Sequence, residues 1–406
     1  MTKLEKYEGF LDSLPDSILF HILSFLPTRD AVWTSILSPR WRYLFTSSIF
    51  EFDFRDCLGH SPVPKEHINN FKKFVDRLFF NPKHLRLESF RVNNKGVNDS
   101  LSNDFLTLYN WLCAALWHGV KEIDVNYFNR DLPVLPTLLF TCPSLVTLKL
   151  YICGWEMKLP TNVCLPNLKT LHLWGIELLD GCLFLSLISG CPVLEDLGLS
   201  NCFLDGTTEL NIYSLLLKIL VLDLKTWVNY RDSIDFDCVF VIDAPSLVHF
   251  QYACLAGKQY TLRNMERLEK ADIELFHFDD ADCEQSATLL QRGICNNPCE
   301  DRTVSVTWIV EFLHCAPNLK TFTLDLADAD RVFESPLEEV PSCLLYHLKE
   351  ISILSFMGDT HMFEIVSYFL NHVLVLEKLK SECRSSIIEK LSSLPKNSKK
   401  CEIEFL

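Results

Sequence analysis

Apolar residues recur every three or four positions near the start of the chain, which is the spacing of one helical face. Ser13 is the predicted N-cap of this helix, with Pro15 in its first turn. The helix is predicted to end at Pro27, because proline cannot donate the next backbone hydrogen bond. The apolar face consists of Leu14, Ile18, Leu19, Ile22, Leu23 and Leu26.

Two more short helices are predicted in the same stretch. Thr28 caps the second, and Ser38 caps the third, with Pro39 at the first helical position, where a missing N–H costs little. The second carries Ala31, Val32, Ile36 and Leu37, and the third runs through Arg40, Trp41, Tyr43 and Leu44. Residues 11–54 thus hold more apolar side chains than a module of this size can bury. The surplus predicts a docking surface.

A repeat follows the helical module. The segment CPSLVTLKL at 142–150 is echoed by LPNLKTLHL at 165–173 and CPVLEDLGL at 191–199. Weaker copies occur around 215–224, at 244–252 and at 316–324. This L-x-x-L-x-L pattern with a period of 20 to 29 residues is typical of short parallel strands that stack and share one elongated core. Segments 183–199 and 308–324 add an amphipathic helix before the strand.

Other elements are expected between and after these copies. A strand with Phe50, Phe52 and Phe54 precedes a helix at 66–80, and a strand with Leu85 and Leu87 precedes a helix at 105–117. The residues at 152–160 are expected to form a loop. After residue 336 we expect a strand at Leu348 to Ile353, a helix around 363–370, another strand, and an edge strand from Cys401 to Leu406.

Composition narrows the class of protein. The formal charge of −15 argues against nucleic-acid binding, which needs a basic surface. Seventeen cysteines without a framework of spacings favour reduced thiols, and therefore the cytosol or nucleus. The sequence has no run of eighteen or more apolar residues, so we expect no membrane span. The N-terminal residues MTKLEKYEGF lack the apolar segment of a signal peptide.

The order LP, LP and SPRWRYL within residues 11–54 resembles the F-box, which joins a substrate receptor to a Skp-family adaptor in cullin–RING ubiquitin ligases. The repeats resemble the irregular leucine-rich repeats of plant proteins, and the segments after residue 336 resemble the FBD domain found with both. The resemblance implies a flexible 1–10, an F-box at 11–54, a leucine-rich-repeat solenoid at 55–335 and an FBD domain at 336–406. The implied fold class is α/β, with parallel strands, helices on the convex side and the FBD as a cap.

The resemblance also implies which residues bind. The adaptor would contact Leu14, Pro15, Ile18, Ile22, Leu26, Pro27 and Trp41. A protein substrate would bind the concave face, where the residues that alternate with the leucines point. These are Thr147, Lys149, Tyr151, Thr170, His172, Trp174, Asp196, Ser200, Ile219, Val221, Asp223, His249, Gln251, Thr321, Thr323 and Asp325. Tyr151 and Trp174 are a candidate hot spot, although both could instead pack under the loop at 152–160.

The sequence carries no phosphate-binding loop, zinc-protease motif or nucleophile elbow. Cys295 and Cys299 are spaced like one half of a zinc site, and His314 and Cys315 could be its other ligands, but the sequence has no second close cysteine pair. The acidic run at 279–284 lacks the glycine turn of a calcium loop. We therefore expect no cofactor and no metal.

The sequence predicts a non-catalytic substrate receptor of an SCF-type ubiquitin ligase. Its expected partners are the adaptor, through it cullin and RING subunits, and an unknown protein substrate. Two alternatives remain: an F-box scaffold that binds the adaptor without forming a ligase, and an enzyme of an unrecognised type.

Overall fold

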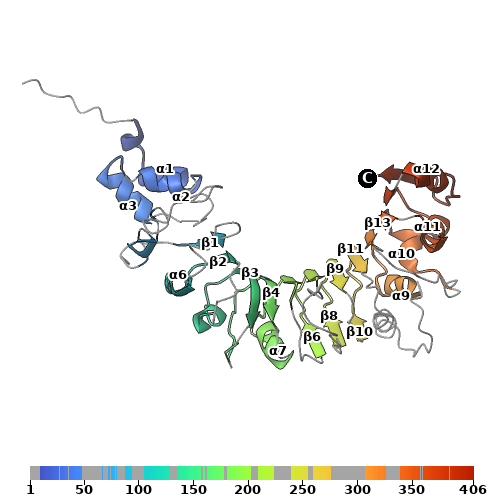
Figure 1. Ribbon diagram of the computed structural model, residues 1–406, viewed down its shortest axis with the longest axis horizontal. Helices are drawn as coiled ribbons and strands as arrows, with labels where there is room; N and C mark the ends of the chain where they lie inside the picture. The colour runs from blue at the N-terminus through green and yellow to red at the C-terminus, as the bar shows by residue number, and fades with distance from the viewer. Residues whose placement is uncertain are drawn as a thin grey trace, which may run out of the picture. The chain divides into compact units, whose positions relative to one another are not determined.

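A computed structural model gives the fold of the chain in two compact units, residues 1–168 and 169–406, each of which is described by itself (Figure 1). The described residues are 10–26, 28–34, 36–47, 66, 72–73, 75–77, 79, 87–93, 105–127, 135–156, 159–160, 162–177, 181–202, 209–223, 239–254, 259–275, 307–325, 339–356, 358, 360–383 and 385–406. Among them, no helix combines the length and apolar character that a membrane crossing requires.

The helical module consists of the 3-10 helix η1 (Phe10–Ser13) and the helices α1 (Asp16–Ser24), α2 (Thr28–Thr34) and α3 (Pro39–Ser47). The predicted cap of the third helix is confirmed, because the Trp41 N–H donates to Ser38 Oγ at 3.3 Å. The predicted cap of the first is wrong. Ser13 belongs to η1, and Pro15 occupies the N-cap position of α1. The second helix is shorter than predicted, so Ile36 and Leu37 lie in the turn after it.

The rest of the first unit contains a small parallel sheet. Its elements are β1 (Ser89–Asn93), α6 (Phe105–Trp117), β2 (Glu122–Tyr127), η2 (Thr137–Phe140) and β3 (Thr147–Glu156). The strands pair in the order β1-β2-β3, which aligns the buried side chains of Phe90, Ile123 and Leu148.

The elements of the first unit agree with the sequence predictions in part. The helix predicted at 105–117 is confirmed at both ends. The loop expected at 152–160 is wrong in its first half, since β3 continues to Glu156. Leu87 is buried but precedes its strand, which starts at Ser89. The described residues of the 66–80 segment are helical. The strand expected at Phe50, Phe52 and Phe54 lies outside the described residues.

The second unit is built around a longer sheet in which every pair of neighbouring strands is parallel. Its strand order is β4-β5-β7-β9-β11-β12-β13-β14-β15. The strands are β4 (Thr170–Glu177), β5 (Asp196–Ser200), β7 (Ile219–Asp223), β9 (His249–Cys254), β11 (Lys270–Leu275), β12 (Thr321–Asp325), β13 (Glu350–Phe356), β14 (Lys378–Cys383) and β15 (Glu402–Phe405).

The backbone just before each strand sets the register of this sheet. The Lys169 carbonyl accepts two N–H groups from the start of β5, and the Glu195 carbonyl accepts two from the start of β7. The same bonds recur at Lys218, Val248, Glu269, Lys320 and Lys349. Asn318 adds a side-chain bond to the Glu266 carbonyl one repeat earlier. Each turn is therefore bonded to its neighbour, and the hydrophobic rows stay aligned.

A second, three-stranded parallel sheet was not predicted. It consists of β6 (Glu209–Tyr213), β8 (Val239–Asp243) and β10 (Gln259–Arg263), paired in the order β10-β8-β6. Figure 1 places these strands with α7 (Gly181–Ser189) on one side of the longer sheet. The side of the sheet opposite the predicted concave face was expected to carry helices. In this stretch it carries strands.

The C-terminal elements follow the prediction more closely. The helices are α9 (Thr307–Cys315), α10 (Ser342–Tyr346), α11 (Thr360–His372) and α12 (Ser385–Ser392), of which α10 and α12 were not expected. Phe312 of α9, Phe322 of β12 and Phe369 of α11 form a continuous aromatic core, with ring centroids 6.1 and 6.0 Å apart. β15 is the edge strand, as predicted.

Candidate functional site

The apolar surface of the helical module is divided between its core and solvent. Pro15 and Ile18 are exposed, Leu14, Ile22 and Leu26 are half-buried, and Pro27 lies outside the described residues. Trp41 is only 3% exposed and packs in the core with Leu19 and Leu23. The structure thus leaves five of the seven predicted contact residues at least partly accessible and buries Trp41.

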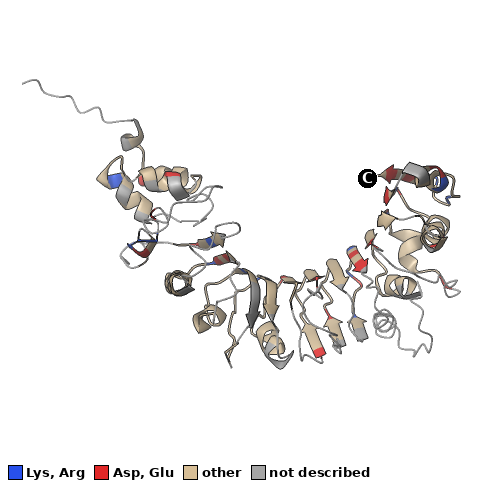
Figure 2. Ribbon diagram, in the orientation of Figure 1, with Lys and Arg blue, Asp and Glu red and all other residues tan. Residues whose placement is uncertain are grey.

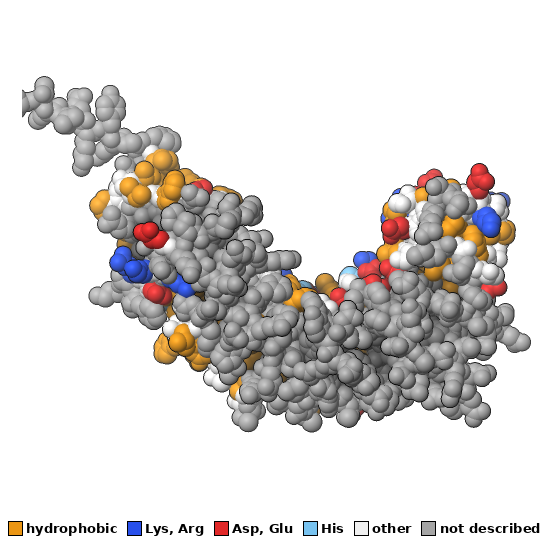
Figure 3. All heavy atoms as spheres, viewed as in Figure 1, with side chains coloured by type: hydrophobic (Ala, Val, Ile, Leu, Met, Phe, Trp, Pro, Cys, Tyr) orange, Lys and Arg blue, Asp and Glu red, His pale blue; other side chains and the backbone are white. Residues whose placement is uncertain are grey.

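Other apolar residues of the module, which were not singled out as contact residues, are more exposed. Ile36 is 80% and Phe25 is 73% exposed. Leu11, Trp33, Leu37 and Tyr43 are exposed as well. Figure 3 shows hydrophobic side chains gathered on this module. Single exposed apolar residues are ordinary on protein surfaces, but a group of this kind on one small module marks an interaction site.

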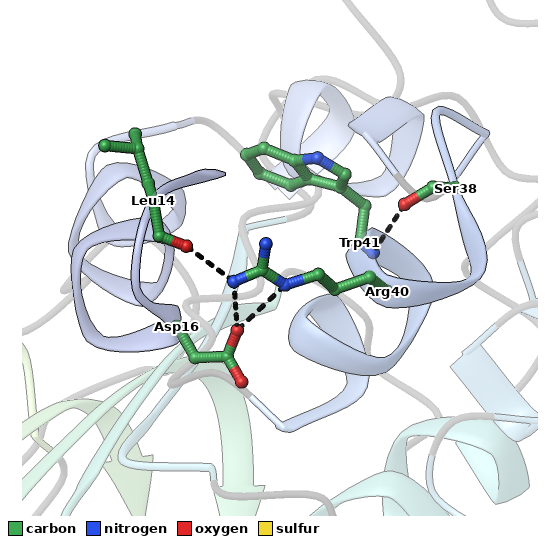
Figure 4. A network of polar contacts seen from close by, with 5 residues as sticks. All are labelled: Leu14, Asp16, Ser38, Arg40 and Trp41. Carbon is green, nitrogen blue, oxygen red and sulfur yellow. Dashed lines mark hydrogen bonds and ion pairs between the residues drawn. The ribbon is translucent and has the colours of Figure 1, made fainter. Parts of the chain in front are cut away.

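Arg40 holds the start of this surface in place (Figure 4). Its Nη2 donates to the Leu14 carbonyl at 2.6 Å and to Asp16 Oδ1 at 2.6 Å, and its Nε donates to the same carboxylate at 3.0 Å. A planar guanidinium presents these donors in a fixed fork, whereas a lysine ammonium is a point charge on a flexible stem. The side chain therefore ties α3 to the segment that carries Leu14 and Pro15.

The second candidate surface is the open face of the repeat sheet, formed by strand residues that alternate with the buried ones. In β3 the side chains of Thr147, Lys149 and Tyr151 are half-buried, while Leu148 and Leu150 are fully buried. The same alternation places the other predicted residues on this face: Thr170, His172, Trp174, Asp196, Ser200, Ile219, Val221, Asp223, His249, Gln251, Thr321, Thr323 and Asp325.

Two histidine–aspartate pairs lie across the open face of the second unit. His172 Nε2 is 3.0 Å from Asp196 Oδ1, and His249 Nε2 is 2.8 Å from Asp272 Oδ2. Gly198 leaves room for the first pair, because a Cβ there would lie 3.0 Å from the His172 ring. Burial alone would raise the pKa of Asp272, but hydrogen bonds from His249, Lys270 and Thr323 outweigh it and lower that pKa to about 2.

Three family models match the chain along its length. An F-box domain model matches residues 11–53, a model of the LRR repeats of FBD-associated F-box protein At5g56370 matches 108–272, and an FBD model matches 335–380. The chain belongs to the F-box/FBD/LRR-repeat family. The helical module is thus its F-box, and the open face belongs to its leucine-rich repeats.

Relatives in Arabidopsis thaliana are similar to the chain over more than two thirds of its length. F-box/FBD/LRR-repeat protein At5g56420 is 28% identical over 98% of this chain and 99% of its own length. FBD-associated F-box protein At4g10400 is 28% identical over 97% of this chain and 99% of its own length. F-box/LRR-repeat protein At3g59210 is 33% identical over 71% of this chain and 61% of its own length.

The leucine-rich repeats include one strand that the predicted row omitted. β11 lies between β9 and β12 and adds Lys270, Asp272 and Glu274 to the open face. Figure 2 shows acidic residues at this strand. Its sequence, MERLEKADIEL, has Leu268, Ala271 and Ile273 at the three leucine positions but carries charge where other copies have proline and asparagine. The spacing of apolar residues, without a requirement for leucine, could have identified it.

The proposed hot spot of Tyr151 and Trp174 stays a prediction. Tyr151 lies on β3 in the first unit and Trp174 on β4 in the second, and both side chains are half-buried.

Several of the cysteines have thiols that are buried in the core. Cys191 and Cys343 are buried, and burial raises the pKa of each thiol to about 12, which keeps it protonated at neutral pH. Within the described part of the chain, no three His, Cys, Asp or Glu side chains are grouped as a metal site would require. Cys295, Cys299 and the acidic run at 279–284 lie outside the described residues.

Proposed function

We propose that this protein is the substrate-recognition subunit of an SCF-type ubiquitin ligase. The F-box would bind a Skp-family adaptor, and through it cullin and RING subunits, while the leucine-rich repeats hold a target protein. The observation that carries the proposal is the exposed apolar surface of the F-box, which includes Pro15, Ile18, Phe25 and Ile36. Such a surface costs free energy in water unless a partner covers it.

In this role the chain does no chemistry itself. Holding a target close to the conjugating enzyme makes ubiquitin transfer effectively intramolecular, which is a rate enhancement by proximity. The protein would act in the cytosol or nucleus, where its cysteines stay reduced. We assign Trp41 to the core that supports the adaptor surface and the more exposed F-box residues to the contact itself.

The proposal is tested by affinity purification of the full-length chain from its own cells with proteasome activity blocked, alongside a Leu14→Ala/Pro15→Ala variant. We expect adaptor, cullin and RING subunits with the wild type and their loss with the variant, while target proteins stay bound. Absence of the adaptor from both samples would refute the proposal. Recovery of the adaptor without cullin would instead favour a scaffold that binds the adaptor outside a ligase.

A further inference from the structure

The turns near the C-terminus carry an unusual concentration of lysine. Residues 390–400 contain four lysines and no acidic residue, although the whole chain has a formal charge of −15. Two of these lysines, Lys399 and Lys400, lie just before β15 and are exposed. No carboxylate of the described residues lies within ion-pair distance of either one. This part of the surface therefore has positive charge that the described residues do not neutralise.

The turn that carries these two lysines, residues 396–401, is bonded to the repeat before it. Ser398 is 6% exposed, and its Oγ donates to the Leu376 carbonyl at 2.6 Å. The Asn397 N–H donates to the Leu370 carbonyl at 2.9 Å. The backbone of the turn is therefore already ordered, so a ligand that binds there does not have to supply the free energy of ordering it.

The two preceding turns add a third lysine and one carboxylate. Lys349 Nζ lies 2.9 Å from Glu377 Oε1, and the Lys349 carbonyl accepts the Glu377 N–H at 2.8 Å. The hydrogen bond from Lys349 and, more weakly, the charge of Lys400 lower the pKa of Glu377. Glu377 is therefore ionised at neutral pH. Its single charge cannot balance the three lysines around it.

Two exposed apolar side chains accompany these charges. Tyr346 is 67% exposed and Leu374 is 52% exposed. The Leu374 N–H donates to the Leu344 carbonyl at 3.1 Å, so the turns that carry Leu374 and Tyr346 are neighbours. We call Tyr346, Lys349, Leu374, Lys399 and Lys400 the C-terminal turn patch.

The fold does not require these apolar residues. Tyr346 and Leu374 each lie four residues before the first residue of a strand, β13 and β14 respectively. In five earlier repeats the same position is occupied by proline: Pro143, Pro166, Pro192, Pro245 and Pro317. Proline suits a turn because its φ is fixed. A large exposed side chain in two successive turns, beside lysines, is typical of an interaction surface.

We propose that the C-terminal turn patch binds a short acidic segment of another protein, with aspartate or glutamate near its lysines and a leucine or phenylalanine against Tyr346 and Leu374. Charge complementarity identifies this occupant, because the lysines outnumber the carboxylate beside them. A nucleic acid is charged along its whole length and would be repelled by the rest of a chain of charge −15, whereas a short segment meets the patch alone. The patch lies at the turns, away from the open face, and the inference does not depend on the proposed receptor role.

The test uses the full-length chain and two variants of the patch. The charge variant, Lys399→Gln/Lys400→Gln, removes two of the positive charges. The apolar variant, Tyr346→Ser/Leu374→Ser, removes the two exposed apolar side chains and leaves the lysines in place. Every replaced side chain is exposed, so neither variant opens a cavity in the core.

A control variant and matched probes complete the design. The control, Lys169→Gln/Lys218→Gln, changes the net charge by the same amount at turns of earlier repeats, where both lysines pair with Glu195. The probe is a fluorescein-labelled twelve-residue peptide of Glu and Leu among Ser residues. A second peptide has Gln in place of Glu, and a third has Ser in place of Leu. A labelled single-stranded oligonucleotide tests the nucleic-acid alternative.

We expect the peptide with Glu and Leu to bind the wild type and the control equally. Each patch variant should bind it at least about fivefold more weakly, because each lacks one of the two kinds of contact. The two altered peptides should bind the wild type more weakly than the first peptide does. Added salt should also weaken binding of the first peptide, because it screens exposed charges.

Several results would overturn the inference: no binding of the peptide to the wild type, equal affinity for the wild type and either patch variant, or an equal loss in the charge variant and the control. Tighter binding of the oligonucleotide than of the peptide would do so too, as would a wild-type dimer that the charge variant abolishes. Equal thermal midpoints establish that the variants fold, and Lys400→Gln or Leu374→Ser, with smaller losses, replaces a pair that does not. Adaptor affinity should be the same in every sample, so failure of the adaptor test leaves this inference standing.

Discussion

Arg40 connects α3 to the segment that carries Leu14 and Asp16. Its ion pair with Asp16 is partly exposed, and exposed pairs contribute only about 0–1 kcal/mol. The charge-assisted bond to the Leu14 carbonyl is the stronger contact, at about 1.5–3 kcal/mol. Arg40 thus holds Leu14 and Pro15 in the geometry that the proposed adaptor contact needs.

Replacing Arg40 with methionine should therefore weaken adaptor binding, because the released segment has to be ordered again on binding. We expect an Arg40→Met variant to bind roughly 5- to 30-fold more weakly, which corresponds to about 1–2 kcal/mol. Calorimetric titration of the purified chain with adaptor measures this. The control Asp16→Asn keeps the Leu14 bond and should change affinity less than about threefold. Equal losses in both variants would mean that the ion pair dominates.

Gly198 is a second residue whose identity follows from a close approach. A methyl group there would lie 3.0 Å from the His172 ring and push it from Asp196. We expect Gly198→Ala to destabilise the chain by about 1 kcal/mol, measured by urea unfolding. In a His172→Ala background the same change should cost nothing, because the clash has been removed. A similar loss in both backgrounds would contradict this explanation.

At the scale of single elements, the sequence predicted those features that depend on local chemistry. Ser38 was correctly predicted as a cap because serine followed by proline suits a helix start, and the apolar spacing of 105–117 fixed both ends of α6. The prediction of Ser13 as an N-cap was wrong because Ser13 belongs to η1, a separate turn before α1. A serine two residues before a proline fits either structure, and the local pattern cannot choose between them.

Pairing between segments that are distant in the sequence explains why the second, three-stranded sheet was not predicted. β6, β8 and β10 form a sheet only because consecutive repeats bring them together, and the apolar alternation within each strand does not show which strands pair. The same limit applies to the candidate site. Trp41 and Ile36 are both apolar residues in the F-box sequence, yet one is 3% and the other 80% exposed. Which side chain faces solvent depends on how the three helices pack, and spacing does not report this.

The hydrogen bonds around Asp272 make the repeat sheet sensitive to acid. Its folded-state pKa of about 2 is below its ordinary value, so ionised Asp272 contributes about 2 kcal/mol at neutral pH. That contribution is lost as pH falls from about 4 through about 2. Urea unfolding at pH 7 and pH 3 should show a smaller loss of stability in Asp272→Asn than in the wild type. Glu266→Gln, at an exposed turn position, is the control and should behave as the wild type.

At the scale of the whole molecule, the proposed adaptor contact and the proposed target contact lie on different parts of the chain, the F-box and the leucine-rich repeats. The F-box exposes apolar residues from a module with a small core, and the repeats provide a sheet with polar and apolar positions on its open face. The C-terminal strands complete that sheet, and Lys378 pairs with Glu404 across the last two of them at 2.7 Å. Charged pairs at an edge strand also discourage pairing with other chains.

The central claim is that the exposed apolar residues of the F-box bind a Skp-family adaptor. The most direct measurement is the affinity of the purified adaptor for the wild-type chain, for a Phe25→Ser/Ile36→Ser variant and for Trp117→Ser. Trp117 is 82% exposed but lies outside the F-box, so its replacement is a matched control. We expect at least tenfold weaker binding for the F-box variant and no change for the control. Equal affinity for all three proteins would contradict it.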